Sequence, residues 1–265
     1  MKKLLLLFLV IPFLFAASPL QQKHLAVIAA LNSGETVANC PVYYADTNVT
    51  FSWDGDETSG TNYGCNSSGT PIEGTFSGTP LEIHTDYGES GSNGANIDTN
   101  GEYLSWPNSS YIVAKNSSGT IWMRVWVSAQ PDNKVTIFES YYVNDDNSIL
   151  MNVESTSSST WGAYRGNNAN YTAYANTTPT GEWMNFHYSW NTLADADDHS
   201  CGKNGTWEDD DGELTNELTN EPTVLLIGQN VEAAFAGGIP GSGKYIYVDR
   251  IAVMSGYKTG VPTNW

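Results

Sequence analysis

The stretch Thr120-Ile-Trp-Met-Arg-Val-Trp-Val-Ser128 is the clearest strand in this sequence. Apolar side chains recur at every second position, and a period of two is the repeat of a β-strand. The odd-numbered positions predict a face that packs into a core. The even-numbered positions carry a cation between two indoles, so the other face suits either packing or ligand contact. The core-facing set is Ile121, Met123, Val125 and Val127, and the opposite set is Trp122, Arg124 and Trp126.

A second strand of the same kind is predicted over residues 183–190, with the sequence Trp-Met-Asn-Phe-His-Tyr-Ser-Trp. Alternation again separates a core face from a face with hydrogen-bonding groups. The core face holds Met184, Phe186, Tyr188 and Trp190, and the other face holds Asn185, His187 and Ser189.

Short apolar runs separated by Gly, Pro, Asn and Ser extend over residues 42–265, and Leu-rich or Ala-rich helical stretches are nearly absent there. This pattern predicts one all-β domain over 42–265, built as a two-sheet antiparallel sandwich. Residues 193–222 are interpreted as an acidic insertion between strands. The predicted strands cover residues 49–53, 80–83, 103–106, 111–114, 120–128, 134–143, 148–154, 160–165, 171–174, 183–190, 223–229 and 244–254.

The N-terminus has the order of a secretory signal peptide, which we expect over residues 1–17. A basic head precedes a short apolar run and then the small residues Ala16, Ala17 and Ser18. Residues 18–41 are predicted to form a short helix or an N-terminal extension. No second long apolar stretch follows, so we expect no membrane insertion and a secreted or cell-surface protein, extracellular or periplasmic.

The formal net charge is −18, from 29 acidic and 11 basic residues. Such a field repels a phosphate backbone, so nucleic acid is not expected as a partner. The acidic excess has two compatible interpretations, which are solubility and the binding of Ca²⁺ through carboxylate oxygens.

Three cysteines are present, and export permits a disulfide. Pairing Cys40 with Cys65 closes a loop of ordinary size and leaves Cys201, in a polar acidic loop, unpaired. The sequence leaves a Cys65–Cys201 bond open as the alternative.

Three segments, in order, resemble the concanavalin A-like (laminin G-like) jelly roll. The segments are 119–128, which begins Gly-Thr-Ile, then 180–191, which contains Gly-Glu-Trp, and finally Leu225-Leu-Ile-Gly228 followed by 245–253, which contains Asp-Arg-Ile. The resemblance covers roughly residues 46–260. It implies a jelly-roll sandwich and a structural calcium ion held by Asp56 and Asp249. Asp54 and Glu57 are neighbours that could replace Asp56.

Enzymes of this superfamily have motifs that can be compared with the chain. The Glu-x-Asp-x-x-Glu strand of retaining glucanases, which supplies two carboxylates on one face, is absent. Alginate-lyase relatives use an Arg on one strand and a His on another, and this chain offers Arg124 and His187 on suitable strands. The rest of the alginate-lyase motifs is missing. The comparison therefore favours a protein without catalytic activity, and if the chain is an enzyme, Arg124 and His187 are its candidates.

The predicted ligand-binding set is Trp122, Arg124, Trp126, Asn185, His187, Tyr164 and Arg165. Aromatic faces stack on the apolar faces of sugars, and an Arg can bind a carboxylate or sulfate with two hydrogen bonds. The competing interpretation is that the tryptophans pack internally, that Arg124 pairs with a nearby acid and that His187 is half-buried.

The function that these patterns predict is a carbohydrate-binding or adhesion module, with an extracellular glycan or a surface protein as partner. A polysaccharide lyase or glycoside hydrolase of the same fold is the first alternative. A structural envelope protein, whose sandwich only assembles, is the second. The sequence does not determine the oligomeric state.

Overall fold

The computed structural model describes residues 40–55, 62–76, 81–99, 101–107, 117–142, 147–154, 160–166, 169–175, 179–191, 198–210, 220–228 and 238–265. These residues belong to one compact unit, Cys40–Trp265. The predicted signal peptide and most of the predicted extension lie outside them. No helix in the described part of the chain has the length and apolar character needed to cross a membrane.

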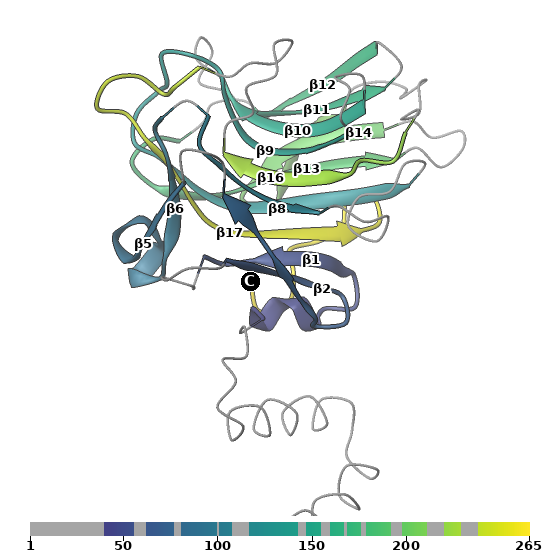
Figure 1. Ribbon diagram of the computed structural model, residues 1–265. Helices are drawn as coiled ribbons and strands as arrows, with labels where there is room; N and C mark the ends of the chain where they lie inside the picture. The colour runs from purple at the N-terminus through teal and green to yellow at the C-terminus, as the bar shows by residue number, and fades with distance from the viewer. Residues whose placement is uncertain are drawn as a thin grey trace, which may run out of the picture. The chain divides into compact units, whose positions relative to one another are not determined.

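Two antiparallel sheets of ten and seven strands pack face to face (Figure 1), so the predicted all-β sandwich is confirmed. The larger sheet contains β1 (Val49–Trp53), β2 (Tyr63–Asn66), β3 (Pro71–Glu73), β5 (Glu82–His84), β6 (Gly94–Ile97), β8 (Ser118–Val127), β13 (Trp183–Asn191), β14 (Asp198–Lys203), β15 (Thr206–Asp210) and β17 (Ile246–Ser255). The smaller sheet contains β4 (Thr75–Phe76), β7 (Tyr103–Pro107), β9 (Val135–Tyr141), β10 (Asn147–Val153), β11 (Thr160–Gly166), β12 (Ala169–Ala175) and β16 (Val224–Gly228).

The strand order explains why the strands that are clearest in the sequence are also the most deeply buried. The order in the larger sheet is β15-β14-β13-β8-β17-β1-β2-β3, and β6 also pairs with β17 and carries β5. The order in the smaller sheet is β12-β11-β10-β9-β16-β7-β4. Strands β8, β13 and β17 are central, so both of their edges are hydrogen-bonded to neighbouring strands.

The core between the sheets is built from the faces that alternation predicted. The four core-facing residues of β8 and the four of β13 are at most 1% exposed and belong to one hydrophobic cluster. Trp53 and Trp106 lie in the same cluster with their ring centroids 6.0 Å apart. The period of two therefore assigned the inner face of both central strands correctly.

Residues 193–222 were not predicted as strands, and this expectation is wrong for part of the segment. Residues 198–210 form the β14–β15 hairpin, which extends the larger sheet beyond β13. Its turn is Asn204-Gly205, and both residues have positive φ, 50° and 83°. An Asn-Gly pair between two strands is a strong hairpin signal, so this hairpin was recognisable from the sequence.

The short strands β2, β3, β4 and β6 were also missed, because two to four residues give too little alternation to detect. Strand β6 begins at Gly94, at the end of a stretch rich in Gly, Ser and Asn. The predicted strand at 111–114 lies outside the described residues. Three short 3-10 turns complete the described elements: η1 (Val42–Ala45), η2 (Thr85–Tyr87) and η3 (Glu89–Gly91).

A disulfide joins Cys40 to Cys65, with the two Cα atoms 5.6 Å apart, so the favoured pairing is confirmed. Cys201 forms no disulfide, as expected, but it does not lie in a polar loop. It is fully buried in β14, opposite Tyr188 of β13.

Candidate functional site

The outer face of the larger sheet carries a line of aromatic side chains that crosses three neighbouring strands. Trp183 of β13 lies opposite Trp126 of β8, and Trp126 lies opposite Tyr247 of β17. Directly paired residues share a face, so these three side chains stand side by side. The indoles of Trp126 and Trp183 meet edge to face with centroids 5.9 Å apart.

Two further tyrosines extend this line through ring stacking. Tyr245 stacks on Tyr247 at 4.5 Å between centroids, and Tyr87 of η2 stacks on Tyr247 at 4.7 Å. We call Trp183, Trp126, Tyr247, Tyr245 and Tyr87 the aromatic row. All five side chains are half-buried, so the row presents ring surface to solvent on a rigid sheet.

Three charged side chains next to the aromatic row, Glu89, Arg124 and Arg250, form ion pairs with one another. Glu89 of η3 accepts hydrogen bonds from Arg124 Nε at 2.9 Å and from Arg250 Nη2 at 3.2 Å, and it is also bonded to Arg124 Nη2. The pKa of Glu89 lies below its usual value, because the hydrogen bond from Arg124 and the charges of both arginines outweigh its partial burial. Arg124 thus pairs with an acid of its own chain.

A β-bulge brings the second arginine into this group. The pairing of β17 with β8 shifts between Val248 and Arg250, so Asp249 is the extra residue and Arg250 lies opposite Arg124. Asp249 is 2% exposed. Its Oδ1 accepts from the Glu89 amide at 3.1 Å and from the Ser92 hydroxyl, and its Oδ2 accepts from Arg250 Nε at 2.6 Å.

These contacts bear on the calcium ion that the resemblance implies. Both carboxylate oxygens of Asp249 already accept hydrogen bonds, one of them from a guanidinium, and a Ca²⁺ ligand needs free oxygen lone pairs. An ion at Asp249 would therefore compete with the Glu89 amide and Arg250 for its oxygens. Among the described residues, no three His, Cys, Asp or Glu side chains cluster as a metal site. Asp56 and Glu57 lie outside those residues, so their part in the prediction stays open.

Two residues of the predicted ligand set are buried beneath other parts of the chain. Trp122 is 2% exposed and His187 is fully buried, and their rings lie 4.2 Å apart. Trp207 of the β14–β15 hairpin covers His187, with ring centroids 4.2 Å apart. Burial lowers the pKa of His187 to about 3, so this imidazole is neutral at ordinary pH and is not placed to act as a base in solution.

The C-terminal tail covers the same part of the sheet. Trp122 donates from Nε1 to the Thr259 carbonyl oxygen at 3.2 Å. Trp265 packs on the cluster around Trp122, donates to Asn185 Oδ1 at 2.9 Å and has the Arg250 guanidinium 5.6 Å from its ring centroid. Asn185 also accepts from Arg124 Nη1 at 3.3 Å. Asn185 is therefore engaged within the chain.

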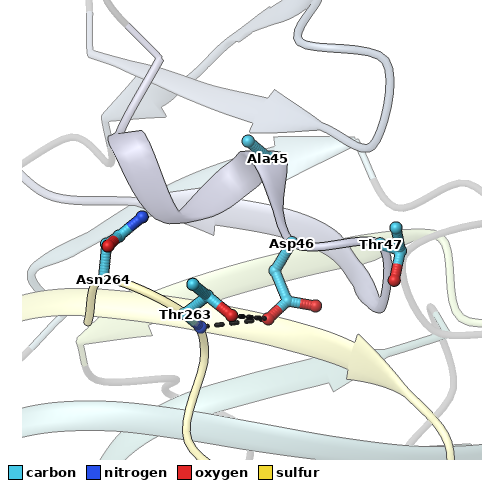
Figure 2. Close-up of a pocket in the computed structure, with 5 residues that line it drawn as sticks. All are labelled: Ala45, Asp46, Thr47, Thr263 and Asn264. Carbon is cyan, nitrogen blue, oxygen red and sulfur yellow. Dashed lines mark hydrogen bonds between the residues drawn. The ribbon is translucent and has the colours of Figure 1, made fainter. Parts of the chain in front are cut away.

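The tail is fastened beside η1, where the structure has a shallow pocket lined by Ala45, Asp46, Thr47, Thr263 and Asn264 (Figure 2). Asp46 Oδ2 accepts from the Thr263 amide at 3.0 Å and from its hydroxyl at 2.9 Å. Burial alone would raise the pKa of Asp46, but the bonds from Thr263 and Asn48 lower it. The carboxylate of this pocket thus holds the tail in place.

Of the predicted ligand set, the structure leaves Trp126 half-buried in the aromatic row. It buries Trp122 and His187 and engages Arg124 and Asn185 within the chain. The side chains of Tyr164 and Arg165 lie outside the described part, although both residues belong to β11. Sequence reasoning missed the other four members of the row. The alternation of Tyr245 and Tyr247 and the position of Trp183, two residues before Asn185, were available signals, but their alignment depends on the strand order.

This fold defines a class, the two-sheet antiparallel β-sandwich of jelly-roll type, here with an aromatic row on its outer face. Solved structures of that class resemble it. The binding domain of botulinum neurotoxin serotype D matches with a TM-score of 0.59 and 10% identity, over 80% of this chain and 49% of that one. The receptor binding domain of the C/D mosaic serotype matches with a TM-score of 0.60 and 8% identity, over 83% and 49%.

The binding domain of Paraclostridial Mosquitocidal Protein 1 is a third such structure, with a TM-score of 0.60 and 10% identity over 79% of this chain and 49% of that one. The chain thus spans about half the length of these domains. No family model matches the sequence, and no curated protein resembles it. At this level of identity the comparisons show the fold alone.

Proposed function

We propose that this chain is a secreted, non-catalytic carbohydrate-binding or adhesion module with a concanavalin A-like sandwich, and that it binds an extracellular glycan on the aromatic row. The single observation that carries the proposal is the alignment of Trp183, Trp126 and Tyr247 across three central strands. Rings held at fixed spacing on a sheet suit the apolar faces of consecutive sugar units, because little flexibility is lost on binding.

The similar structures support a binding role. They are named as binding or receptor binding domains of toxins, and one of them was solved in complex with rat synaptotagmin II. They share the sandwich and not the sequence. The choice of a glycan over a protein ligand therefore rests on the aromatic row itself.

The two alternatives have less support. His187, a candidate for catalysis, is fully buried and neutral, and Arg124 is paired with Glu89. Of the large hydrophobic side chains that the structure describes, the exposed ones are Ile239 and Val261. Apart from the aromatic row, the described surface thus presents no group of exposed large hydrophobic side chains for assembly into an envelope.

The glycan proposal is tested by screening the full-length protein on a glycan array and titrating the best ligand by calorimetry. We expect Trp126→Ala to weaken binding by about tenfold or more, because aromatic residues at the centre of a contact surface carry most of its binding energy. Tyr103→Ala, which removes a half-buried ring from β7 of the other sheet, is the matched control and should bind normally. Thermal unfolding of each variant separates lost binding from lost folding.

An unchanged affinity in a folded Trp126→Ala protein would move the site elsewhere. Binding to a surface protein with no binding to any glycan would contradict the carbohydrate part of the proposal.

Calcium belongs to the proposal only as an expectation from the sequence resemblance. A ligand that binds the folded state alone raises its stability by mass action. A higher unfolding temperature in Ca²⁺ than in EDTA, lost in Asp249→Ala, would support a structural ion at that residue. An equal unfolding temperature in the two buffers would contradict the calcium prediction.

A further inference from the structure

The charges around the aromatic row indicate which kind of glycan it accepts, an inference that rests on the proposed function. We propose that the row binds sugars without acidic groups and prefers sugars that bear a free amino group. The sequence alone suggested the opposite preference, in which Arg124 would bind a carboxylate or sulfate.

The cations that border the row are already paired. Arg124 bonds to Glu89, and Arg250 bonds to both Glu89 and Asp249. Lys244, which precedes Tyr245 in the chain, bonds to Asp132 at 2.6 Å and to the Gln130 carbonyl oxygen at 2.8 Å. An acidic sugar would have to displace an internal carboxylate to reach any of these three groups. Such an exchange gives no net gain in paired charge.

Two acidic side chains that border the row, Glu82 and Asp98, are held by neutral hydrogen-bond donors and not by cations. The register places Asn96 of β6 beside Tyr247, and Glu82 of β5 beside Asn96, so Glu82 lies at the end of the same line. Glu82 is exposed and accepts a hydrogen bond from the Tyr87 hydroxyl at 3.1 Å.

A second carboxylate lies beside the first. Asp98 is half-buried and accepts from the Asn96 amide at 2.8 Å. Neutral donors hold both Glu82 and Asp98 in place without cancelling their charge. Nearby acids also act on the tyrosines: the pKa of Tyr247 is raised to about 12, mainly by burial and in part by Tyr245, Tyr87 and Asp98. An ammonium group near Tyr87 and Tyr247 would therefore meet negative potential.

The ring faces add to the same preference. An ammonium group is attracted to the face of a Tyr or Trp ring, and the attraction is strongest where water is partly excluded. The stacked tyrosines Tyr87, Tyr247 and Tyr245 provide such faces next to Glu82 and Asp98. The net charge of −18 works in the same direction, because it repels anionic polymers at long range.

The test compares three oligosaccharides of equal length on the full-length protein. A chitosan oligomer carries free amines, a chitin oligomer is its neutral N-acetylated form, and a polyuronate oligomer carries carboxylates. We expect the affinity to fall in that order. Only the chitosan affinity should weaken clearly when salt rises from 50 to about 500 mM, because added ions screen exposed charge pairs.

Two isosteric variants locate the preference. Glu82→Gln and Asp98→Asn keep their hydrogen-bond acceptors and remove the charge, and each should reduce the chitosan affinity roughly threefold. Both variants should leave chitin binding unchanged. Glu73→Gln, at the far edge of the larger sheet in β3, is the control and should change neither affinity.

The outcomes separate this inference from the function on which it depends. Stronger binding of polyuronate than of chitosan, with both lost in Trp126→Ala, would overturn the charge preference and keep the glycan site. An equal loss of chitin and chitosan binding in Glu82→Gln would also overturn it. Binding of any of the three that does not depend on Trp126 would overturn the site itself.

Discussion

At the scale of single residues, His187 lies in an environment that differs sharply from water. It is fully buried between the indoles of Trp122 and Trp207, with both ring centroids 4.2 Å from its own. The sequence placed it correctly on the outer face of β13, but that face was expected to be open to a ligand. The hairpin and the tail cover it instead.

The burial of His187 predicts a pH dependence of stability. Its pKa is lowered from 6.5 to about 3 on folding, so the unfolded chain binds a proton in that window which the folded chain does not. The free energy of unfolding should therefore fall as the pH decreases from about 6.5 toward 3, by about 1.4 kcal/mol per pH unit for one proton. Chemical unfolding measured at several pH values gives this slope.

The variant His187→Gln should be less stable at neutral pH. Between pH 6.5 and about 3, its free energy of unfolding should depend less steeply on pH, by about the 1.4 kcal/mol per pH unit that one proton contributes. His84→Gln is the control for the substitution itself, because the His84 side chain is 60% exposed. A slope that is equal in wild type and His187→Gln would contradict the buried, neutral state.

At the scale of elements, the β14–β15 hairpin decides which part of the outer face is closed. It carries Trp207 onto His187. Gly202 of β14 leaves room for the His187 ring, since a Cβ at position 202 would lie 2.2 Å from His187 Cε1. The segment looks like an acidic loop by composition. The segment nevertheless forms a hairpin, because the Asn204-Gly205 turn allows its two strands to pair. The contact of Trp207 with His187 then holds the hairpin on the sheet.

The hairpin turn provides a prediction about backbone conformation alone. Gly205 has φ +83°, and a Cβ at this position would meet nothing within 4 Å. Gly205→Ala should therefore lower the free energy of unfolding by about 1 kcal/mol through strain of the backbone. Urea unfolding measures this loss.

Gly260 is the matched control, because it has equal space and no positive φ. Gly260→Ala should be neutral or slightly stabilising, because it reduces the freedom of the unfolded chain. Equal losses in the two variants would show that the turn conformation is not the cause.

At the scale of the whole molecule, two links between distant residues reinforce the described unit near β1. The tail returns to η1 through the bond between Thr263 and Asp46, and the C-terminus lies beside β1 (Figure 1). The disulfide joins Cys40, the first residue of the compact unit, to β2, across 25 residues. Both links act near β1, at the side of the sheet away from the hairpin.

Loss of the disulfide should destabilise the unit to a predictable extent. Closing a loop of this length in the unfolded chain is worth about 3 kcal/mol in the chain-entropy description. The double variant Cys40→Ala/Cys65→Ala should therefore unfold at lower urea concentration, by an amount that corresponds to about 2–4 kcal/mol.

Reductant is the control for this prediction. It should destabilise the wild type and leave the double variant unchanged, because Cys201 is buried and forms no disulfide. A double variant as stable as the oxidised wild type would show that the bond has no part in stability.

The sequence by itself determined the all-β class, the strands β1, β8 and β13 and the inner face of the central strands, and it favoured the disulfide pair that the structure has. These follow from alternation and chain separation, which are local properties. The tertiary structure decided what alternation cannot reach. Strand order placed Trp183, Trp126 and Tyr247 in one line, and a bulge at Asp249 turned Arg250 toward Glu89.

The contrast between two tryptophans of one strand shows the physical reason. Trp122 and Trp126 share a face of β8 and are indistinguishable by pattern, yet one is 2% exposed and the other is half-buried in the aromatic row. The difference is made by Thr259 and Trp265, more than a hundred residues away in the chain. Local sequence fixes the direction in which a side chain points, and only distant chain segments decide whether water reaches it.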